Sequence, residues 1–322
     1  MTYSTQSAFL SNLIYDDGRV NQGAADTKAR YVGPNGSLWE IKAFRESSSG
    51  YQGAIFKNVD TGEVMLVNRG TEIGVLGGAG PTAFEALKDL ITDAQMGVGA
   101  LPGQFLVAEE LRREAQRIAD DSGSALKITG HSLGGSISQY LGAKYGVETE
   151  TFNAYGIGNI LAELGISVAD PSKITNHILH YDPVSMLPGS KMVGTTLDYK
   201  TPADAVLDTG VGAFLSLYGI GETVVDRILD SHGIGNFQDG TLAAQAGQKI
   251  DIDVLNPIVE LNSWIQHTFG SRGYSGSLMD LELGISPLTA TTFTLATQAL
   301  PARRDPLTLD LDGNGLDTTG ID

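Results

Sequence analysis

Between residues 105 and 181 the chain alternates helix-type and strand-type patterns, and this alternation restricts the fold more than any other feature. Residues 105–120 carry apolar side chains at three- and four-residue spacing, which predicts an amphipathic helix. The elements predicted after it are a strand at 125–129, a helix at 133–145, and strands at 148–153 and 173–181. Strands joined by crossover helices form a mainly parallel sheet. The sequence therefore predicts an α/β fold with helices on both faces of the sheet.

Three strand-like segments come before this region, at residues 38–44, 51–58 and 64–68. Short turns join them, including the hairpin signal Asp60-Thr-Gly62, so antiparallel pairing is expected at this end of the sheet. The first forty residues form a mixed polar segment. A nucleotide-binding sheet is the alternative within the same class, but neither of the glycine-rich phosphate-binding motifs occurs in the sequence.

The charge and the absence of cysteine exclude several classes of function. The net charge is −17, from 21 Lys and Arg against 38 Asp and Glu. Binding to a nucleic-acid backbone needs clustered cations, so no nucleic-acid partner is expected. With no cysteine, thiol catalysis, thiolate metal sites and disulfides are excluded. No transmembrane segment is predicted, because the longest uncharged run, residues 283–302, contains two prolines and five threonines.

The first residues show no cationic start followed by an apolar core, so no cleavable signal peptide is visible. The expectation is a protein secreted without such a peptide, with a cytoplasmic location as the alternative.

Ser132 lies in Gly130-His-Ser-Leu-Gly-Gly135, where the predicted strand passes into a helix. Glycine is abundant, at 41 of 322 residues, so the pentapeptide G-x-S-x-G has weight only through this position. A serine on such a sharp turn needs small neighbours, because side chains at Gly130 or Gly134 would collide with the strand and the helix. The helix N-terminus supplies backbone donors for developing negative charge. We predict that Ser132 is a nucleophile; the alternative is a plain glycine-rich turn.

A serine nucleophile requires a base, and the chain has five histidines. His131 is expected to point away from Ser132 Oγ. His177 and His180 are expected to face opposite sides of a strand. Both also precede the acid candidate, whereas the usual order in this class of fold is serine, acid, histidine.

Two histidines remain, and one carboxylate is well placed to orient the base. His232 begins a loop of small residues that can approach a nucleophile, whereas His267 has aromatic neighbours that suggest a packed position. Asp182 ends a strand-like run and is followed by Pro183, which places it at the same sheet edge as the nucleophile. We predict His232 as base and Asp182 as its partner. The rival carboxylates are Asp170, Asp198, Asp226 and Asp230.

These residues resemble the class 3 (fungal-type) lipases and related phospholipase A1-like enzymes of the α/β-hydrolase superfamily. The matching segments are Val67-Asn-Arg-Gly-Thr71, Gly130-His-Ser-Leu-Gly-Gly135, Phe152-Asn-Ala-Tyr-Gly-Ile-Gly-Asn159, Tyr181-Asp-Pro-Val184 and His232. The resemblance implies an α/β-hydrolase fold and a Ser132, Asp182, His232 triad. It also implies an oxyanion hole formed by Thr71 and the backbone N–H of Leu133. The chain differs from the family pattern at Asn68, where an aromatic residue usually precedes Arg-Gly.

The C-terminal part carries a second resemblance. Residues 305–317 look like a segment of large, leaderless secreted bacterial proteins of the RTX-like kind, and they imply that the chain continues into a longer protein. Asp310, Asp312, Asn314 and Gly315 fit four positions of a calcium loop, but Ile321 stands where its closing Glu should be. Calcium is thus a possible ligand, the alternative being an acidic turn. We expect a hydrolase domain at 1–240 and an extension at 241–322.

The predicted function is a serine carboxylester hydrolase acting on lipids, of phospholipase A1 or triacylglycerol lipase type, without a required cofactor. The uncharged segment 209–221 is either a lid over the active site or a buried core helix. Two other functions stay open. One is an acyltransferase or thioesterase with the same triad, and the other is a non-catalytic lipid-binding or adhesion module.

Overall fold

The structure is a computed structural model that describes residues 3–16, 18–20, 29–70, 83–187, 189–200, 230–238, 240 and 242, with side chains of the 83–187 segment described from residue 98. All of these residues belong to one compact unit. Of the predicted extension 241–322, only Leu242 is described, so the boundary at residue 240 stays a prediction.

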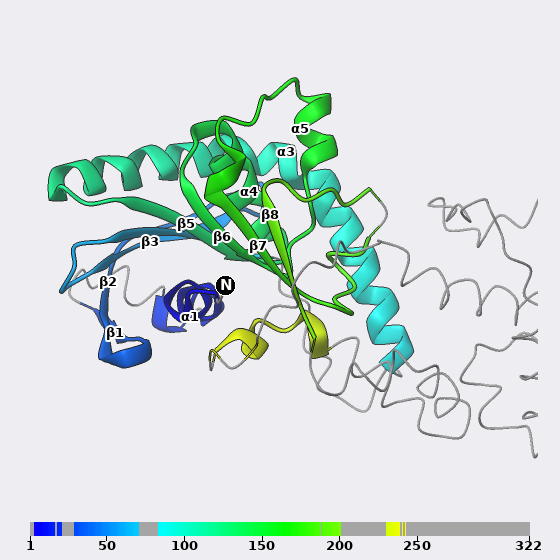
Figure 1. Ribbon diagram of the computed structural model, residues 1–322, viewed down its shortest axis with the longest axis horizontal. Helices are drawn as coiled ribbons and strands as arrows, with labels where there is room; N and C mark the ends of the chain where they lie inside the picture. Colours follow the sequence, from blue (N-terminus) through cyan, green and yellow to red (C-terminus); the bar gives the residue numbers. More distant parts are fainter. Residues whose placement is uncertain are drawn as a thin grey trace, which may run out of the picture. The chain divides into compact units, whose positions relative to one another are not determined.

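An eight-stranded mixed sheet organises this unit, and its strands follow chain order from one edge to the other (Figure 1). The strands are β1 (Arg30–Val32), β2 (Leu38–Glu46), β3 (Gln52–Asn58), β4 (Val64–Asn68), β5 (Leu126–His131), β6 (Glu148–Phe152), β7 (Ile174–Leu179) and β8 (Thr195–Tyr199). The first four pair antiparallel, and β4 to β8 pair parallel. The predicted antiparallel start and parallel remainder are confirmed.

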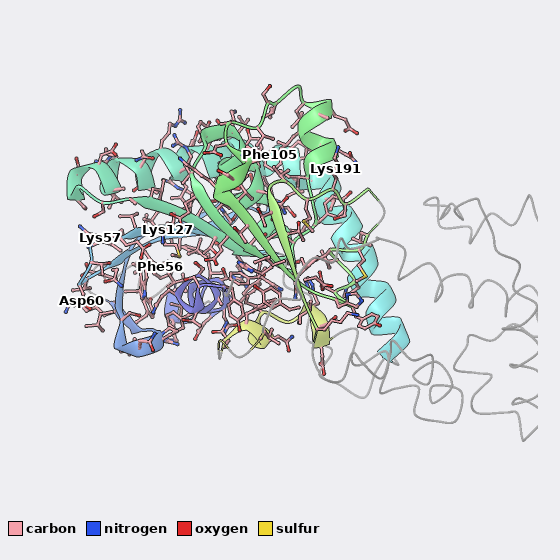
Figure 2. All side chains as sticks on the ribbon, in the orientation of Figure 1. Phe56, Lys57, Asp60, Phe105, Lys127 and Lys191 are labelled. Atoms are coloured by element: carbon pink, nitrogen blue, oxygen red, sulfur yellow. The ribbon has the colours of Figure 1, made fainter. Side chains whose placement is uncertain are left out.

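Helices cover both faces of the sheet, as predicted. The helices α3 (Ala83–Ser122) and α4 (Leu133–Tyr145) pack on one face (Figure 1), and Figure 2 labels Phe105 of α3 on this side of the sheet. Phe105 stacks on Tyr140 of α4 with ring centroids 3.8 Å apart. The helix α1 (Thr5–Leu13) and the 3-10 helix η4 (Ile234–Phe237) lie on the other face. The remaining helical elements are α5 (Gly158–Glu163), η1 (Pro34–Gly36) and η2 (Pro171–Lys173).

The helix α3 is longer than predicted, because it begins at Ala83 rather than at residue 105. It continues through Pro102, which lacks the backbone donor of an interior helical residue. Leu101, Phe105 and Ala108 on either side of this proline are buried. Their packing holds the helix together where the proline would otherwise end it.

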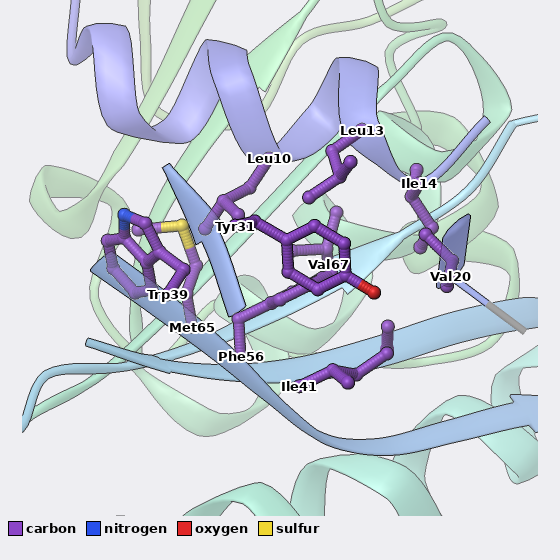
Figure 3. Close-up of a cluster of buried hydrophobic side chains, with 11 residues drawn as sticks. Leu10, Leu13, Ile14, Val20, Tyr31, Trp39, Ile41, Phe56, Met65 and Val67 are labelled. Atoms are coloured by element: carbon purple, nitrogen blue, oxygen red, sulfur yellow. The ribbon is translucent and has the colours of Figure 1, made fainter. Parts of the chain in front are cut away.

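The helix α1 replaces part of the predicted polar segment and fills the core on its side of the sheet. Ser4 caps it by accepting a hydrogen bond from the Ser7 N–H, and the Ser11 hydroxyl bonds to Thr129 of β5 at 3.0 Å. Two buried clusters meet along α1. The first contains Leu10, Leu13, Ile14, Val20, Tyr31, Trp39, Ile41, Ala54, Phe56, Met65 and Val67 (Figure 3). The second contains Tyr3, Ala8, Phe152, Leu179, Tyr199, Ile234 and Phe237.

Candidate active site

Ser132 occupies the sharp turn between β5 and α4. Its backbone angles, φ 57° and ψ −131°, lie in a region that L-residues rarely adopt. Such a conformation costs on the order of 1–3 kcal/mol and persists only where the surroundings enforce it. The strain lifts the serine out of the line of the strand, which is the geometry of a nucleophile elbow.

The glycines around Ser132 are required by close backbone contacts. A Cβ atom at Gly130 would lie 2.5 Å from the carbonyl of Gly134, and one at Gly134 would lie 2.2 Å from the carbonyl oxygen of Asn68. Neither contact can be relieved by moving a side chain, since both involve main-chain atoms. The predicted need for small residues on both sides of the serine is therefore met by the structure.

The structure brings Ser132, His232 and Asp182 into one hydrogen-bonded line. Ser132 Oγ lies 3.0 Å from His232 Nε2, and His232 Nδ1 lies 2.6 Å from Asp182 Oδ1. All three side chains are buried. Because the carboxylate accepts the hydrogen on Nδ1, Nε2 is left free to accept the hydrogen of the serine hydroxyl. The line can thus remove a proton from Oγ and stabilise the imidazolium that results.

Asp182 is held by its own neighbours. Its second oxygen, Oδ2, accepts a hydrogen bond from the Ser185 N–H at 2.7 Å and another from the Ser185 hydroxyl. Its backbone N–H donates to Leu179 O at 2.9 Å, at the end of β7. The carboxylate is therefore oriented from both sides, with one oxygen reserved for the histidine.

The strand β4 ends beside the nucleophile, where the oxyanion hole is predicted. A Cβ atom at Gly70 would lie 3.1 Å from Ser132 Cβ, so the two backbones are in close contact. Leu133 begins α4, and the N–H groups in the first turn of a helix have no acceptor within the helix. Thr71, the other predicted donor, lies outside the described residues.

Residues 6–218, more than half of the chain, match the sequence profile of a phospholipase-like family, the Tle-like phospholipase domain. The chain belongs to this family. As a member of the Tle-like phospholipase domain family it is a lipid esterase, and the predicted lipase and phospholipase relationship is confirmed. Among curated protein sequences, none shows significant similarity to the chain.

Among solved structures, the chain is similar to the Lip2 lipase of Yarrowia lipolytica, with 17% identity over 60% of this chain and 76% of that one, at a TM-score of 0.40. It is also similar to the Rhizomucor miehei lipase in its propeptide complex, with 11% identity over 62% and 68% of the two chains and a TM-score of 0.37. A third similar structure is a triacylglycerol lipase from Penicillium expansum, with 12% identity over 62% of this chain and 81% of that one and a TM-score of 0.31.

The other histidines of this Tle-like domain have different partners where the structure describes them. His177 is buried between Tyr199, whose hydroxyl is 2.8 Å from Nδ1, and Glu150, whose Oε1 is 3.0 Å from Nε2. His180 Nδ1 lies 2.7 Å from Oδ2 of the buried Asp198. His267 lies outside the described residues.

None of the described alternatives to Asp182 has a recorded hydrogen bond to the side chain of His232. Asp198 is engaged with His180, and Asp170 is an exposed N-cap that accepts from Ser172. Asp230 is exposed and lies two residues before His232, and Asp226 lies outside the described residues.

Three further residues support His232, and the sequence analysis gave them no such role. Asn153 has a positive φ of 45°, and its Nδ2 donates to Ser231 O at 2.7 Å and to His232 O at 3.0 Å. His131 Nε2 lies 2.7 Å from the same His232 oxygen, and Tyr15 bonds to His131 Nδ1 at 3.0 Å. Asparagine tolerates a positive φ better than most residues, so its place after β6 was the one available signal.

Asn68, the position at which the chain differs from the family pattern, joins two parts of the fold through its side chain. It is fully buried, accepts from the Tyr51 hydroxyl at 2.8 Å, and donates to Ser138 Oγ at 2.9 Å. These bonds connect the end of β4 to the residue before β3 and to α4.

A polar cavity of about 740 Å³ lies at the amino ends of β5, β6 and β7, and it is lined by none of the three triad residues. The cavity lies at the opposite ends of the strands from Ser132, so it is separate from the candidate active site.

Within the described residues, no cluster of His, Asp and Glu could hold a metal ion. The same part of the chain contains no helix long and apolar enough to cross a membrane. The predicted calcium loop (residues 310–321) and the predicted lid (residues 209–221) lie outside the described residues.

Proposed function

We propose that this domain hydrolyses a carboxylic ester of a phospholipid, with phospholipase A1-type specificity, through an acyl-enzyme on Ser132. The observation that carries the proposal is the continuous line from Ser132 Oγ through His232 to Asp182, with spacings of 3.0 Å and 2.6 Å. The family match supports a phospholipid substrate in preference to a triacylglycerol. Secretion without a signal peptide stays a prediction.

The reaction follows from the hydrogen-bond geometry. Ser132 Oγ attacks the acyl carbonyl carbon while His232 Nε2 takes its proton, and Asp182 stabilises the imidazolium. The tetrahedral oxyanion would receive hydrogen bonds from the Leu133 N–H and from Thr71. The imidazolium then gives its proton to the glycerol oxygen, which releases the lysophospholipid. Water, deprotonated by His232, attacks the acyl-enzyme and frees the fatty acid and Ser132.

The test compares the wild-type protein with Ser132→Ala, and with Ser124→Ala as a control at a serine remote from the triad. Substrates are a short-chain nitrophenyl ester, phospholipid vesicles with distinguishable acyl chains at the two glycerol positions, and a triacylglycerol emulsion. Release of the sn-1 chain by the wild type and by Ser124→Ala is expected, with a loss of roughly 10⁴-fold or more in Ser132→Ala.

Each other outcome contradicts a defined part of the proposal. Activity that survives in Ser132→Ala excludes this serine as the nucleophile. Release from triacylglycerol but not from phospholipid excludes the proposed substrate. If an added alcohol acceptor receives most of the acyl groups, the domain is an acyltransferase with the same triad.

A further inference from the structure

A second histidine lies directly against the catalytic one. The ring centroids of His131 and His232 are 4.7 Å apart, and His131 Nε2 lies 2.7 Å from the backbone carbonyl oxygen of His232. A carbonyl oxygen can only accept a hydrogen bond, so Nε2 of His131 must carry a hydrogen. This bond acts on the main chain of the base and leaves the ring of His232 to Ser132 and Asp182.

The other nitrogen of His131 bonds to the hydroxyl of Tyr15. The Tyr15 hydroxyl lies 3.0 Å from His131 Nδ1 and accepts the backbone N–H of Gly70 at 3.1 Å. In a neutral ring whose hydrogen is on Nε2, Nδ1 is an acceptor, so Tyr15 donates to it. The bonds thus run in one direction, from Gly70 through Tyr15 and His131 to the carbonyl of His232.

His131 remains neutral in this position. Burial is the main cause, and together with the neighbouring His232 it lowers the pKa of His131 to about 3. Neutrality matters because His232 becomes positively charged when it takes the serine proton. A second cation 4.7 Å away would oppose that charge.

Gly70, the first residue in this series of hydrogen bonds, lies against Ser132, beside the proposed oxyanion hole. Gly70 immediately precedes Thr71, and a Cβ atom on it would lie 2.6 Å from the Tyr15 hydroxyl oxygen. The guanidinium of Arg69 lies 5.3 Å from the Tyr15 ring centroid and restrains the ring. Tyr15 is therefore packed against the backbone that follows β4.

We propose that His131 is a positioning residue that ties the backbone at Gly70, just after β4, to the main chain of the catalytic His232, with Tyr15 as the connecting group. The inference rests on the proposed function, because Ser132 and His232 must carry the reaction. Its consequence is that the base is held at a fixed spacing from the Gly70 backbone, which lies against Ser132. Errors of about 1 Å in such a spacing can cost roughly a hundredfold in rate.

The test is a double-mutant cycle with Tyr15→Phe and His131→Leu, measured as kcat per active site on the nitrophenyl ester. Active sites are counted with a fluorophosphonate probe, so that misfolded protein does not contribute. His131→Gln is the conservative variant, since its amide nitrogen reaches about as far as Nε2 and can still donate to His232 O. Tyr31→Phe is the matched control, because Tyr31 also lies on the α1 side of the sheet and its hydroxyl donates to Arg19 O at 2.7 Å.

We expect Tyr15→Phe to lower kcat about tenfold and His131→Leu about a hundredfold, with KM nearly unchanged. His131→Gln should resemble Tyr15→Phe, because it loses only the link to Tyr15. Adding Tyr15→Phe to either His131 variant should cause no further loss, since residues in one network are not additive. If His131→Leu yields no folded protein, the cycle with His131→Gln makes the same comparison.

Two results would overturn the inference. One is a double variant whose loss is the product of the single losses. The other is a kcat per active site within twofold of wild type in both single variants, with only the melting temperature lowered. Failure of the proposed function looks different, since Ser132→Ala would then retain activity. If Ser132→Ala is inactive but the losses of Tyr15→Phe and the His131 variant are additive in free energy, only the proposed role of His131 is contradicted.

Discussion

Asp182 Oδ1 and His232 Nδ1 are joined by a 2.6 Å hydrogen bond at a place where the carboxylate is completely buried. With Oδ2 occupied by Ser185, the carboxylate has one orientation available to it. It therefore determines which ring nitrogen of His232 carries hydrogen. In the proposed mechanism the reactivity of Ser132 depends on that choice, although no hydrogen bond joins Asp182 to Ser132.

Asp182→Asn tests this dependence. An amide NH₂ group facing Nδ1 would move the ring hydrogen to Nε2, where it could no longer accept the proton of Ser132. We expect kcat to fall roughly 10³–10⁴-fold with little change in KM. Steady-state kinetics on the nitrophenyl ester measures the effect, with the exposed cap variant Asp170→Asn as control. A loss below tenfold would argue against the tautomer role.

Asn153→Asp tests the support of the His232 main chain. The variant replaces the donor to Ser231 O and His232 O with a carboxylate oxygen, which repels both carbonyls. His232 O keeps its bond from His131, but the loss of the shared Asn153 donor and the new repulsion cost about 1–3 kcal/mol. We expect a clear fall in melting temperature and in kcat per active site. Asn159→Asp, at an exposed asparagine that donates to Gly189 O, should change neither.

A pair of glycine variants tests the turn at the nucleophile. In Gly134→Ala the new methyl group would meet Asn68 O at 2.2 Å, so the elbow must open and activity should be lost. In Gly103→Ala the methyl group meets nothing within 4 Å on the helix α3, and stability should rise by about 0.5–1 kcal/mol. Chemical denaturation measures the stability of the two variants, and ester hydrolysis measures their activity. If Gly134→Ala were as stable and as active as Gly103→Ala, the packing described for the elbow would be contradicted.

Stability should depend on pH through His131. Its pKa falls from 6.5 in the unfolded chain to about 3 in the folded protein because it is buried. Between these values the unfolded chain binds more protons, so the free energy of unfolding decreases as the pH falls below 6.5. The decrease is at most about 1.4 kcal/mol per pH unit from one group.

Denaturation curves between pH 7.5 and 5.0 measure this dependence. We expect His131→Gln to lose less stability than the wild type over this range. Burial raises the pKa of Glu150, but the hydrogen bond from His177 and its other contacts outweigh burial and lower it overall. Stability from Glu150 is therefore lost only below the ordinary carboxyl value of 4.5, outside the measured range. Parallel curves for the two proteins would show that His131 does not titrate as described.

The sequence was sufficient for the parts of the fold that local patterns determine. The strands β2 to β7 and the helix α4 show their periodicity within a few residues, and Ser132 stands at a recognisable strand-to-helix junction. Asp182 and His232 were predicted as a pair from chain order and from the strand that ends before Asp182, and the structure places them 2.6 Å apart. These inferences needed no knowledge of which distant segments touch.

What the sequence did not reveal depends on distant contacts. The helix α1 was missed because Ser7 and Ser11 are buried in it and interrupt its apolar stripe. The strand β8 was missed because it lies at the sheet edge and buries only Asp198 and Tyr199. Tyr15 and His131 are 116 residues apart in the chain, so no local pattern could connect them.

The order of the elements along the chain also sets when this hydrolase can begin to work during its synthesis. His232 follows Ser132 by 100 residues, and Gln238 then bonds across to Ala8 O at 3.0 Å. A growing chain that ends at β8 already has the proposed nucleophile and acid but not the proposed base. By the proposed mechanism, the nascent hydrolase therefore has no group to activate its serine until the ribosome has released the segment around residue 232.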